Sequence, residues 1–377
     1  EAFMQSDDSP LRTGWTTGAC ATAAVKAACQ ALATGDFPDP VSIRLPQGQE
    51  PAFALALHHM ADGAATAGIV KDAGDDPDVT HGALVLASVR PLPAGSGVRF
   101  KAGAGVGTVT RPGLPVPVGE PAINPAPRKM MRAAVADVAK LHGGPADVEI
   151  ELGVENGERI AERTLNPRLG IIGGLSILGT TGIVKPYSCS AWIHGIHRGV
   201  DVARAAGLTH IAGATGKTSE QAVLRHHGLP ELALIDMGDF VGGMLKYVRS
   251  HPLPRVTIAG GIAKMAKLAQ GLLDLHSKRG EVDLEALAAR SLDAGGTKHL
   301  AELIRASNTA AEAYGHAEAE GVPLGNAVAR AAWETAAGVL DDPAIMLDVL
   351  LFDREGTLKA HTEPLPAYRP ARPRKRR

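Results

Sequence analysis

The 377-residue sequence is poor in features that mark several classes of protein. It has three cysteines, 3% aromatic residues and a formal net charge of -1. Three cysteines are too few for a disulfide framework, so we expect reduced thiols and a cytoplasmic protein. Because few rings are available to stack on bases and no net positive charge attracts phosphates, we expect no nucleic-acid partner.

Long apolar runs are also missing. No stretch reaches about 18 apolar residues without a charge or a glycine, so we expect no membrane-spanning helix. No signal peptide is visible. The one dense basic run is the tail from Arg369 to Arg377, which is typical of a solvated terminus.

Glycine, in contrast, is abundant, and the richest stretch runs from Asn166 to Ser188. It reads N-P-R-L-G-I-I-G-G-L-S-I-L-G-T-T-G-I-V-K-P-Y-S and holds five glycines. Glycine permits positive φ and lets another group approach the backbone closely. The stretch is therefore either a crossover between domains or a ligand-binding segment, and the two interpretations are compatible.

The pattern changes after this stretch, which predicts two domains. Residues 1-187 combine an Ala-rich helix with short strand-like runs between Pro/Gly/Asp turns, as expected for an α+β domain. In residues 188-377, strand–helix units recur about every 23 residues, the spacing of parallel βαβ crossovers. We expect an α/β Rossmann-like domain with a parallel sheet, further helices, and a closing hairpin of 345–352 with 358–361.

Three local features of the first domain are also predicted. Thr17 is expected to cap the Ala-rich helix that follows it. Residues 148–152 and 158–164 are expected to pair as a hairpin across the turn at Glu155-Asn-Gly157. Gly103-Ala-Gly-Val-Gly107 resembles the start of a dinucleotide fingerprint, but prolines 112 and 115 exclude the helix that this fingerprint requires.

Candidate cofactor residues lie at the carboxyl ends of the predicted parallel strands, where ligands bind in such sheets. A glycine loop followed about 20 residues later by an acidic residue at the next strand end is typical of a nucleoside site. Its carboxylate accepts ribose hydroxyls, so the pattern fits NAD or S-adenosylmethionine. The predicted cofactor-binding residues are Gly213, Thr215, Gly216, Asp236, Gly260 and Gly261.

Three other segments carry polar groups of open function. Arg12-Thr-Gly-Trp-Thr-Thr-Gly18 precedes a helix whose N-terminus either attracts an anion or is simply capped. Lys71 to Asp78 holds four aspartates, which suit either a polar turn or a hard cation such as Mg²⁺. Cys189, His194 and His197 do not have a standard metal-ligand spacing, and we predict no metal centre.

Four segments, taken in order, resemble the CbiD family. They are Arg12–Gly18, Lys71–Thr80, Gly119–Pro125 and Asn166–Pro186, and the last is the most specific. The resemblance extends from about Arg12 to His361. It implies a cobalt-precorrin-5B C1-methyltransferase of cobalamin biosynthesis, which transfers a methyl group from S-adenosylmethionine to C1 of a ring-contracted corrin precursor. It also implies a cytoplasmic enzyme with an α+β first domain and a Rossmann-like second domain.

The sequence departs from the family pattern at two places. After Val184 many relatives carry an acidic residue and P-M-S-E-E-A-L, whereas this chain continues with Lys185-Pro-Tyr-Ser-Cys189. The segment that resembles G-H-P-G-K-L is here Gly260-Gly-Ile-Ala-Lys264-Met. Because basic or aromatic residues replace acidic or neutral ones, a cobalt-free precorrin-5 type substrate is an alternative to the cobalt form.

The implied substrate carries many carboxylates, so its pocket needs Arg, Lys and backbone donors. The predicted substrate-binding residues are Arg12, Thr16, Thr17, Lys71, Arg128, Arg168, Ser176, Thr180, Thr181 and Lys185. Lys264 is a further candidate for binding a carboxylate. A base that removes a ring proton after methyl transfer is expected to be Asp72, Asp75 or His194, and the sequence does not choose among them.

Two alternative functions stay open. One is a nicotinamide-dependent reductase of the same pathway, because the glycine loop and Asp236 suit that cofactor equally well. The other is a non-catalytic carrier of corrinoid intermediates. Glycine motifs in both halves favour two ligands and hence catalysis. The expected partners are the corrinoid substrate, a second copy of the chain in a homo-oligomer, and neighbouring pathway enzymes in transient contact.

Overall fold

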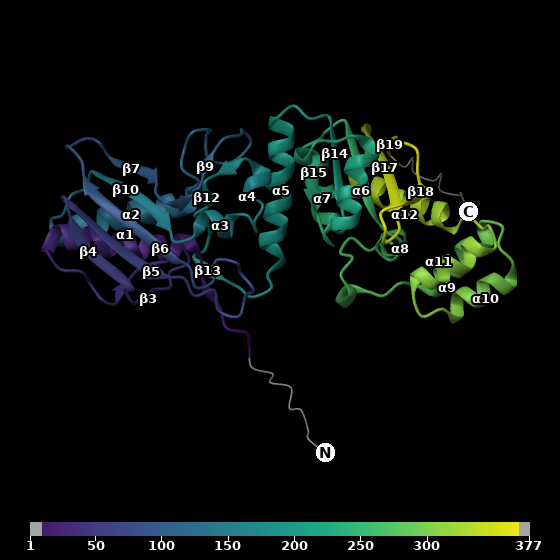
Figure 1. The fold of residues 1–377 in the computed structure, drawn as a ribbon, viewed down its shortest axis with the longest axis horizontal. Helices are drawn as coiled ribbons and strands as arrows, with labels where there is room; N and C mark the ends of the chain where they lie inside the picture. Colours follow the sequence, from purple (N-terminus) through teal and green to yellow (C-terminus); the bar gives the residue numbers. More distant parts are fainter. Residues whose placement is uncertain (1–9, 369–377) are drawn as a thin grey trace, which may run out of the picture. The chain divides into compact units, whose positions relative to one another are not determined.

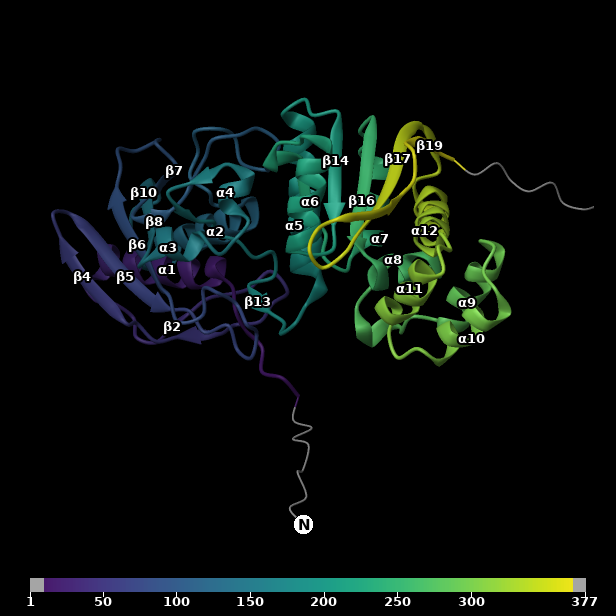
Figure 2. The same ribbon diagram turned by 45° about the vertical axis from the view of Figure 1, so that its right-hand side comes forward.

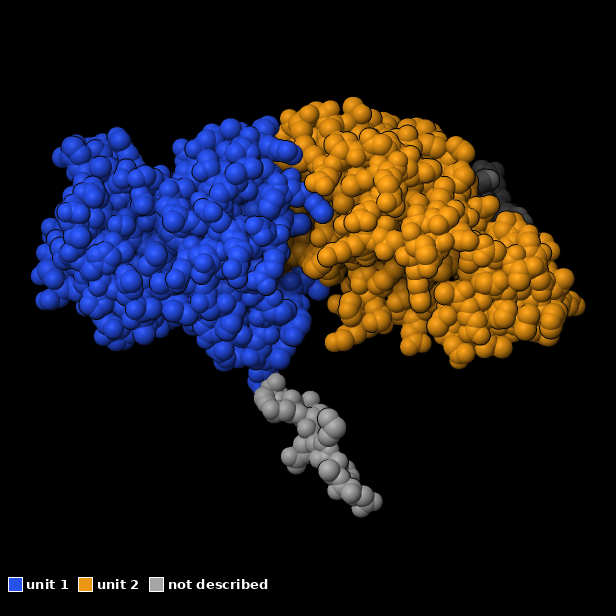
Figure 3. Space-filling model, viewed as in Figure 1, with its two compact units in different colours: residues 1–189 blue, residues 190–377 orange. Residues whose placement is uncertain are grey.

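The computed structural model describes residues 10–368, and the chain divides into two compact units, residues 1–189 (unit 1) and 190–377 (unit 2) (Figure 3). The basic tail from Arg369 to Arg377 lies outside the described residues. That the chain consists of two domains divided between residues 187 and 188 stays a prediction. The overall class is a mixed α/β protein.

Unit 1 contains a mixed sheet in the order β4-β5-β6-β10-β7 (Figure 1). Its strands are β4 (Leu57–Ala61), β5 (Ala64–Val70), β6 (Leu84–Pro91), β7 (Val98–Ala102) and β10 (Val148–Val154). Neighbouring strands are antiparallel except β10 and β7, which are parallel. Alternate residues of β6 and β10 are buried, as expected for a sheet covered on one face.

The helix α1 (Thr17–Thr34) packs against β5, β6 and the helix α2 (Pro125–His142). Its buried residues are mostly alanines, which let a helix approach its neighbours closely. The prediction that Thr17 caps this helix is wrong by one residue. Thr16 has the extended backbone that a cap requires, and its side chain accepts a hydrogen bond from the N–H of Ala19 (3.1 Å).

Short elements connect the loops of unit 1. They are β1 (Gly14–Trp15), β2 (Val41–Ser42), β3 (Ala52–Phe53), β8 (Gly105–Val106), β9 (Thr108–Val109), α3 (Gly157–Ala161), α4 (Asn166–Leu169), β11 (Ile171–Ile172), β12 (Gly174–Leu175) and β13 (Ile183–Val184). The predicted hairpin of 148–152 with 158–164 is wrong, because β6 and β7 already occupy both edges of β10. Residues 157–161 form the helix α3 instead.

Unit 2 is built on a sheet in the order β15-β14-β16-β17-β18, and Figure 2 shows β14, β16 and β17 next to one another. Its strands are β14 (His210–Ala214), β15 (Leu234–Asp236), β16 (Arg255–Gly261), β17 (Asp342–Phe352), β18 (Leu358–His361) and β19 (Leu365–Ala367). The first four in spatial order pair in parallel. Strands β18 and β19 pair antiparallel with β17, which confirms the predicted closing hairpin.

Helices cover both faces of this sheet. They are α5 (Cys189–Ala205), α6 (Lys217–His227), α7 (Val241–Ser250), α8 (Ile262–Ala269), α9 (Leu284–Asp293), α10 (Lys298–Ala306), α11 (Ala310–Ala319) and α12 (Leu324–Leu340), with short 3₁₀ turns at Glu231–Ala233 and Ser277–Arg279. Ile211 and Ile258 face the core shared with α5, α7, α8 and α12, whereas Ala212 and Ala214 pack with Ala222 and Val223 of α6. Among residues 10–368, no helix is long and apolar enough to cross a membrane.

Candidate functional site

The strand order of unit 2 marks one edge of its sheet as a candidate ligand site. From β14 the chain passes to its neighbour β15 and then returns to the other side of β14 for β16. In open parallel sheets, ligands bind outside the carboxyl ends of the two strands that flank such a reversal. These ends are Ala214 and Gly261, and Asp236 ends the adjoining strand. All six residues predicted to bind a cofactor lie at or next to these strand ends.

The glycines at this edge have different roles. A Cβ on Gly213 would lie 2.5 Å from the sulfur of Met244, and a Cβ on Gly260 would lie 2.7 Å from the hydroxyl of Thr215. These two glycines are therefore closely packed against neighbouring side chains. Around Gly216, in contrast, no atom of the described chain apart from its two neighbours in sequence lies within 4 Å of the position that a Cβ would take. Gly216 is the glycine of the loop that is open to a ligand.

Two helices begin at the same edge. Gly216 is the N-cap of α6 and Gly261 is the N-cap of α8, and both have extended backbones. Because glycine has no side chain, neither N-cap residue accepts a hydrogen bond from the first turn of its helix. The N-terminal N–H groups and the dipoles of the two helices make this edge favourable for negative groups.

Asp236 is half-buried at the end of β15 beside an aromatic residue that the sequence analysis did not select. The indole N–H of Trp192 donates to the main-chain carbonyl of Asp236 (3.0 Å). The same ring covers Gly238, where a Cβ would lie 3.0 Å from it. Trp192 nevertheless stays 49% exposed, so a fixed apolar surface lies next to the acidic strand end.

In unit 1 the glycine-rich stretch is bonded to two other motif segments. The N–H of Trp15 donates to the carbonyl of Asp72 (2.7 Å), that of Thr16 to Gly182 (3.0 Å) and that of Gly18 to Leu178 (2.9 Å). Strand β1 also pairs with β13. The three segments 12–18, 71–80 and 166–186 thus form one cluster, although they lie far apart in the sequence.

Several glycines in this cluster are required because main chains cross in contact. A Cβ on Gly14 would lie 2.0 Å from the carbonyl carbon of Ala73, and one on Gly74 would lie 2.2 Å from the carbonyl oxygen of Arg12. A Cβ on Gly179 would lie 2.3 Å from the side chain of Thr16. The glycines of this cluster therefore allow the backbone segments to lie in contact.

Two of the predicted substrate-binding residues form hydrogen bonds with other groups of the protein. Lys71 is 2% exposed, and its ammonium group donates to Asp78 and Thr80. The Arg128 guanidinium donates to Glu120 (3.1 Å) and to the carbonyls of Ile123 (2.8 Å) and Pro121 (3.1 Å). These side chains stabilise the loops around them, and a direct contact with substrate stays a prediction.

The hydroxyl and amide groups of the cluster also bond locally. Thr17 exchanges hydrogen bonds with the main chain of Leu178 (3.0 and 3.2 Å), and Thr181 does so with Ile183 (3.2 Å). Ser176 donates to the side chain of Asn166 (3.2 Å), which itself donates to the carbonyl of Gly174 (3.0 Å).

The remaining predicted residues are nearer the surface. Arg168 is half-buried in the last turn of α4, whereas Arg12, Thr180 and Lys185 are exposed. These three exposed residues belong to the cluster formed by segments 12–18, 71–80 and 166–186. They are the members of the predicted set that a ligand reaches without rearrangement of the fold.

The three candidate bases lie in different surroundings. The Arg12 guanidinium donates two hydrogen bonds to Asp72, and this contact lowers the pKa of the Asp72 carboxyl below its ordinary value. Asp75 accepts a hydrogen bond from the N–H of Arg12 (2.6 Å). His194 is exposed on α5, with its ring centre 6.2 Å from that of His197. Because Arg12 holds Asp72 ionised, Asp72 is a weak base.

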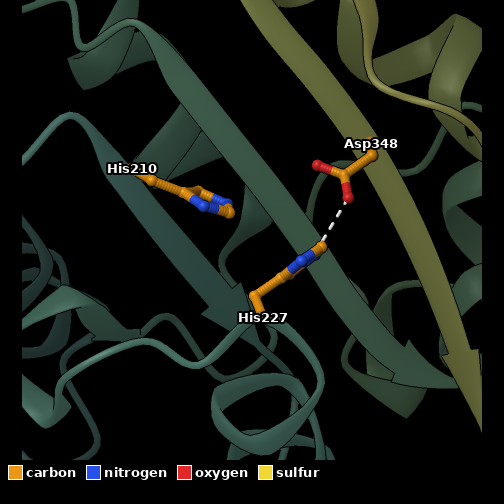
Figure 4. A group of neighbouring side chains, drawn as sticks. All are labelled: His210, His227 and Asp348. Carbon is orange, nitrogen blue, oxygen red and sulfur yellow. Dashed lines mark hydrogen bonds and ion pairs between the residues drawn. The ribbon is translucent and has the colours of Figure 1, made fainter.

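A separate polar group lies near the amino end of β14, where α6 ends (Figure 4). In the described part of the chain, His210, His227 and Asp348 have ligand atoms within 4.8 Å of one another. Asp348 accepts hydrogen bonds from His227 (3.0 Å), Arg255 (3.2 Å) and Thr257 (2.7 Å), and His210 bonds to Thr257 (2.8 Å). Because these bonds satisfy the group and Arg255 brings a positive charge, we assign it a structural role. The absence of a metal centre stays a prediction.

This group predicts a pH dependence of stability. Burial, with the charges of Arg255 and His227, lowers the pKa of His210 to about 4, against about 6.5 in an unfolded chain. The unfolded chain therefore binds more protons between these values, and the unfolding free energy falls as the pH falls from 6.5 towards 4. After discounting for partial exposure, we expect a loss of about 1–2 kcal/mol.

Urea unfolding at pH 7 and pH 4.5 measures this loss. In His210→Gln the difference between the two pH values should shrink. The exposed neighbour His226 supplies the control His226→Gln, which should behave as the unsubstituted protein does. An unchanged pH dependence in His210→Gln would show that another group is responsible.

Comparisons with known proteins support the family resemblance of the motif segments. The family model CbiD matches residues 4–186, and the model of the CbiD C-terminal domain matches residues 274–363. A cobalt-precorrin-5B C(1)-methyltransferase from Agrobacterium fabrum is 61% identical over 368 residues, which cover 98% of this chain and 97% of the relative. One from Paramagnetospirillum magneticum is 62% identical over 351 residues, with 93% and 98% covered.

One solved structure is also similar. It is the cobalamin biosynthesis protein (cbiD) from Archaeoglobus fulgidus, which is 26% identical and matches 71% of this chain and 83% of its own. The TM-score is 0.39, so the geometry of that structure supports no argument about this one.

Proposed function

The chain belongs to the CbiD family and has the function of a cobalt-precorrin-5B C(1)-methyltransferase in cobalamin biosynthesis, and from this premise we propose where its two ligands bind. The methyl donor is S-adenosylmethionine, and it binds at the carboxyl edge of the parallel sheet of unit 2. In this proposal the sheet binds its nucleoside as a Rossmann-like sheet does, because a glycine loop follows β14 and an acidic residue ends β15.

The observation that carries this proposal is the reversal of strand order at β14. It places the open Gly216 and the start of α6 at the edge that Gly261 and Asp236 also reach. The Gly216 loop approaches the nucleoside, and the Asp236 carboxylate accepts ribose hydroxyls. The exposed face of Trp192 provides an apolar surface beside them.

Methyl transfer requires mainly alignment of the two ligands. S-adenosylmethionine supplies an activated methyl group, and the protein holds it in line with an electron-rich ring carbon. On unit 1, we propose that Arg12, Thr180 and Lys185 contact the carboxylates of the corrin precursor. The buried Lys71 and the half-buried Arg128 hold their loops in place. Asp75 or His194 removes the ring proton.

The test is calorimetry and methyl transfer with labelled S-adenosylmethionine, with and without a precorrin-5 class pigment in its cobalt and cobalt-free forms. We expect donor binding by the protein and label in one of the two pigments. A carrier would bind pigment and consume no donor, whereas a reductase would change the absorbance of NAD(P)H. Either result, or no donor binding under any condition, would contradict the proposal. Cytoplasmic location, homo-oligomerisation and contacts with pathway enzymes stay predictions.

A further inference from the structure

Two lysines of α8 point their ammonium groups at one carbonyl beside the proposed donor site. Lys264 and Lys267 both donate to the carbonyl of Leu275, at 3.3 Å each. Lys264 also forms an ion pair with Asp239, which follows β15 by three residues. The main-chain carbonyl of Asp239 accepts from the N–H of Leu275 (2.9 Å), so the loops after β15 and α8 are bonded together here.

The group formed by Lys264, Lys267 and Asp239 has more positive than negative charges. Lys267 is 7% exposed, and within residues 10–368 its ammonium group donates to the carbonyl of Leu275 and to no carboxylate. Two ammonium groups thus share one carboxylate, which leaves one positive charge. An ammonium offers three donors, and burying a charge without a counter-charge is costly. The first turn of α8, which contains Lys264, adds the positive end of a helix dipole.

The group also has a negative member at its surface. The side chains of Lys264 and Asp239 are 34% and 21% exposed, so both are accessible from solvent while Lys267 lies beneath them. An adjacent ammonium and carboxylate, with an additional positive charge behind the ammonium, complement a ligand that carries a carboxylate and an ammonium of its own. An α-amino acid zwitterion has this arrangement.

We propose that Lys264 and Asp239 bind the amino-acid end of the methyl donor, an inference that rests on the donor site proposed above. Lys264 contacts the carboxylate and Asp239 the ammonium, in place of their bond to each other. Lys267 acts as a positioning residue: it holds the Leu275 carbonyl and supplies the excess positive charge. The nucleoside end lies at Gly216 and Asp236, and the amino-acid end lies at Asp239 and α8.

Three adenosyl compounds separate the two ends in calorimetry. They are S-adenosylmethionine, its decarboxylated form, which keeps the ammonium, and 5′-methylthioadenosine, which lacks both groups. Lys264→Met should weaken binding of S-adenosylmethionine at least tenfold and leave the other two unchanged. Asp239→Asn should weaken the two compounds that carry the ammonium and leave 5′-methylthioadenosine unchanged.

Lys267→Met distinguishes binding from a role in folding. An apolar side chain of similar length removes a buried charge, so the melting temperature of the free protein should stay the same or rise. Affinity for S-adenosylmethionine should still fall at least threefold, with no effect on 5′-methylthioadenosine. The exposed Lys278 provides the control Lys278→Met, which should change none of these values.

The outcomes separate this inference from the donor site itself. If the protein binds 5′-methylthioadenosine and the lysine variants weaken all three compounds equally, or none, the amino-acid assignment is wrong and the nucleoside site stands. If the lysine variants weaken only pigment binding, the carboxylate belongs to the corrin precursor, and this too overturns the assignment. If the unsubstituted protein binds none of the three compounds, the donor site itself is wrong.

Discussion

Gly14→Ala is expected to destabilise unit 1 by at least about 3 kcal/mol or to prevent its folding. The added Cβ would lie 2.0 Å from the carbonyl carbon of Ala73 and 2.4 Å from its Cα. Both atoms belong to main chain, so no side chain can turn away to relieve the overlap. The segment would have to move, and the hydrogen bond from Trp15 to Asp72 and the pairing of β1 with β13 would be lost.

Urea unfolding followed by circular dichroism measures this loss. Gly48→Ala is the matched control in the same unit, because Gly48 has φ +94 and no atom of the described residues within 4 Å of a Cβ. That variant should lose only the cost of a left-handed backbone, about 1–2 kcal/mol. Equal losses in the two variants would mean that the crossing of segments 12–18 and 71–80 is not tight.

The alternation of strands and helices in unit 2 could be predicted because its signals are local. The parallel strands β14, β15 and β16 are short apolar runs that end at or next to a glycine or an aspartate, and each is followed by a helix. The hairpin of β17 and β18 was also predicted, since Asp353-Arg-Glu-Gly356 marks a turn between apolar runs. The order of the strands was not predictable in this way, because it depends on which edges pair in three dimensions.

The hairpin predicted across residues 155–157 failed for a related reason. The Asn-Gly turn and the flanking apolar residues favour strand pairing locally. Both edges of β10 are taken by β6 and by β7, which lies about 50 residues earlier in the chain. Tertiary pairing therefore overrode the local preference, and residues 157–161 became helical.

The partners of the polar residues in the two proposed sites could not be predicted from the sequence either. The sequence indicates that Lys71 and Lys264 lie near glycine motifs, but their partners follow from the folded loops. Lys71 is paired with Asp78, only seven residues away, and is buried, whereas Lys264 is paired with Asp239 from another loop and stays accessible. Residue type and motif do not distinguish a buried lysine from an accessible one, whereas burial in the folded protein does.

Asp236→Asn is expected to weaken binding of S-adenosylmethionine by about 10- to 100-fold, or roughly 1.4–2.7 kcal/mol. The substitution keeps the shape of the side chain but removes the charge that accepts two ribose hydroxyls in the proposed complex. The affinity for 5′-methylthioadenosine should fall by the same factor, because that compound keeps the ribose. This parallel loss distinguishes Asp236 from Asp239, whose substitution should spare 5′-methylthioadenosine.

The control for Asp236 lies at the opposite end of the same strand. Glu231 is exposed and precedes β15 at its amino end, so Glu231→Gln removes the same charge far from the proposed ribose. It should leave both affinities unchanged, and calorimetry on the two variants gives the comparison directly. Thermal unfolding of Asp236→Asn confirms that the variant is folded before its affinity is measured. If Asp236→Asn is folded and binds S-adenosylmethionine as tightly as the unsubstituted protein does, the nucleoside does not bind at this strand end.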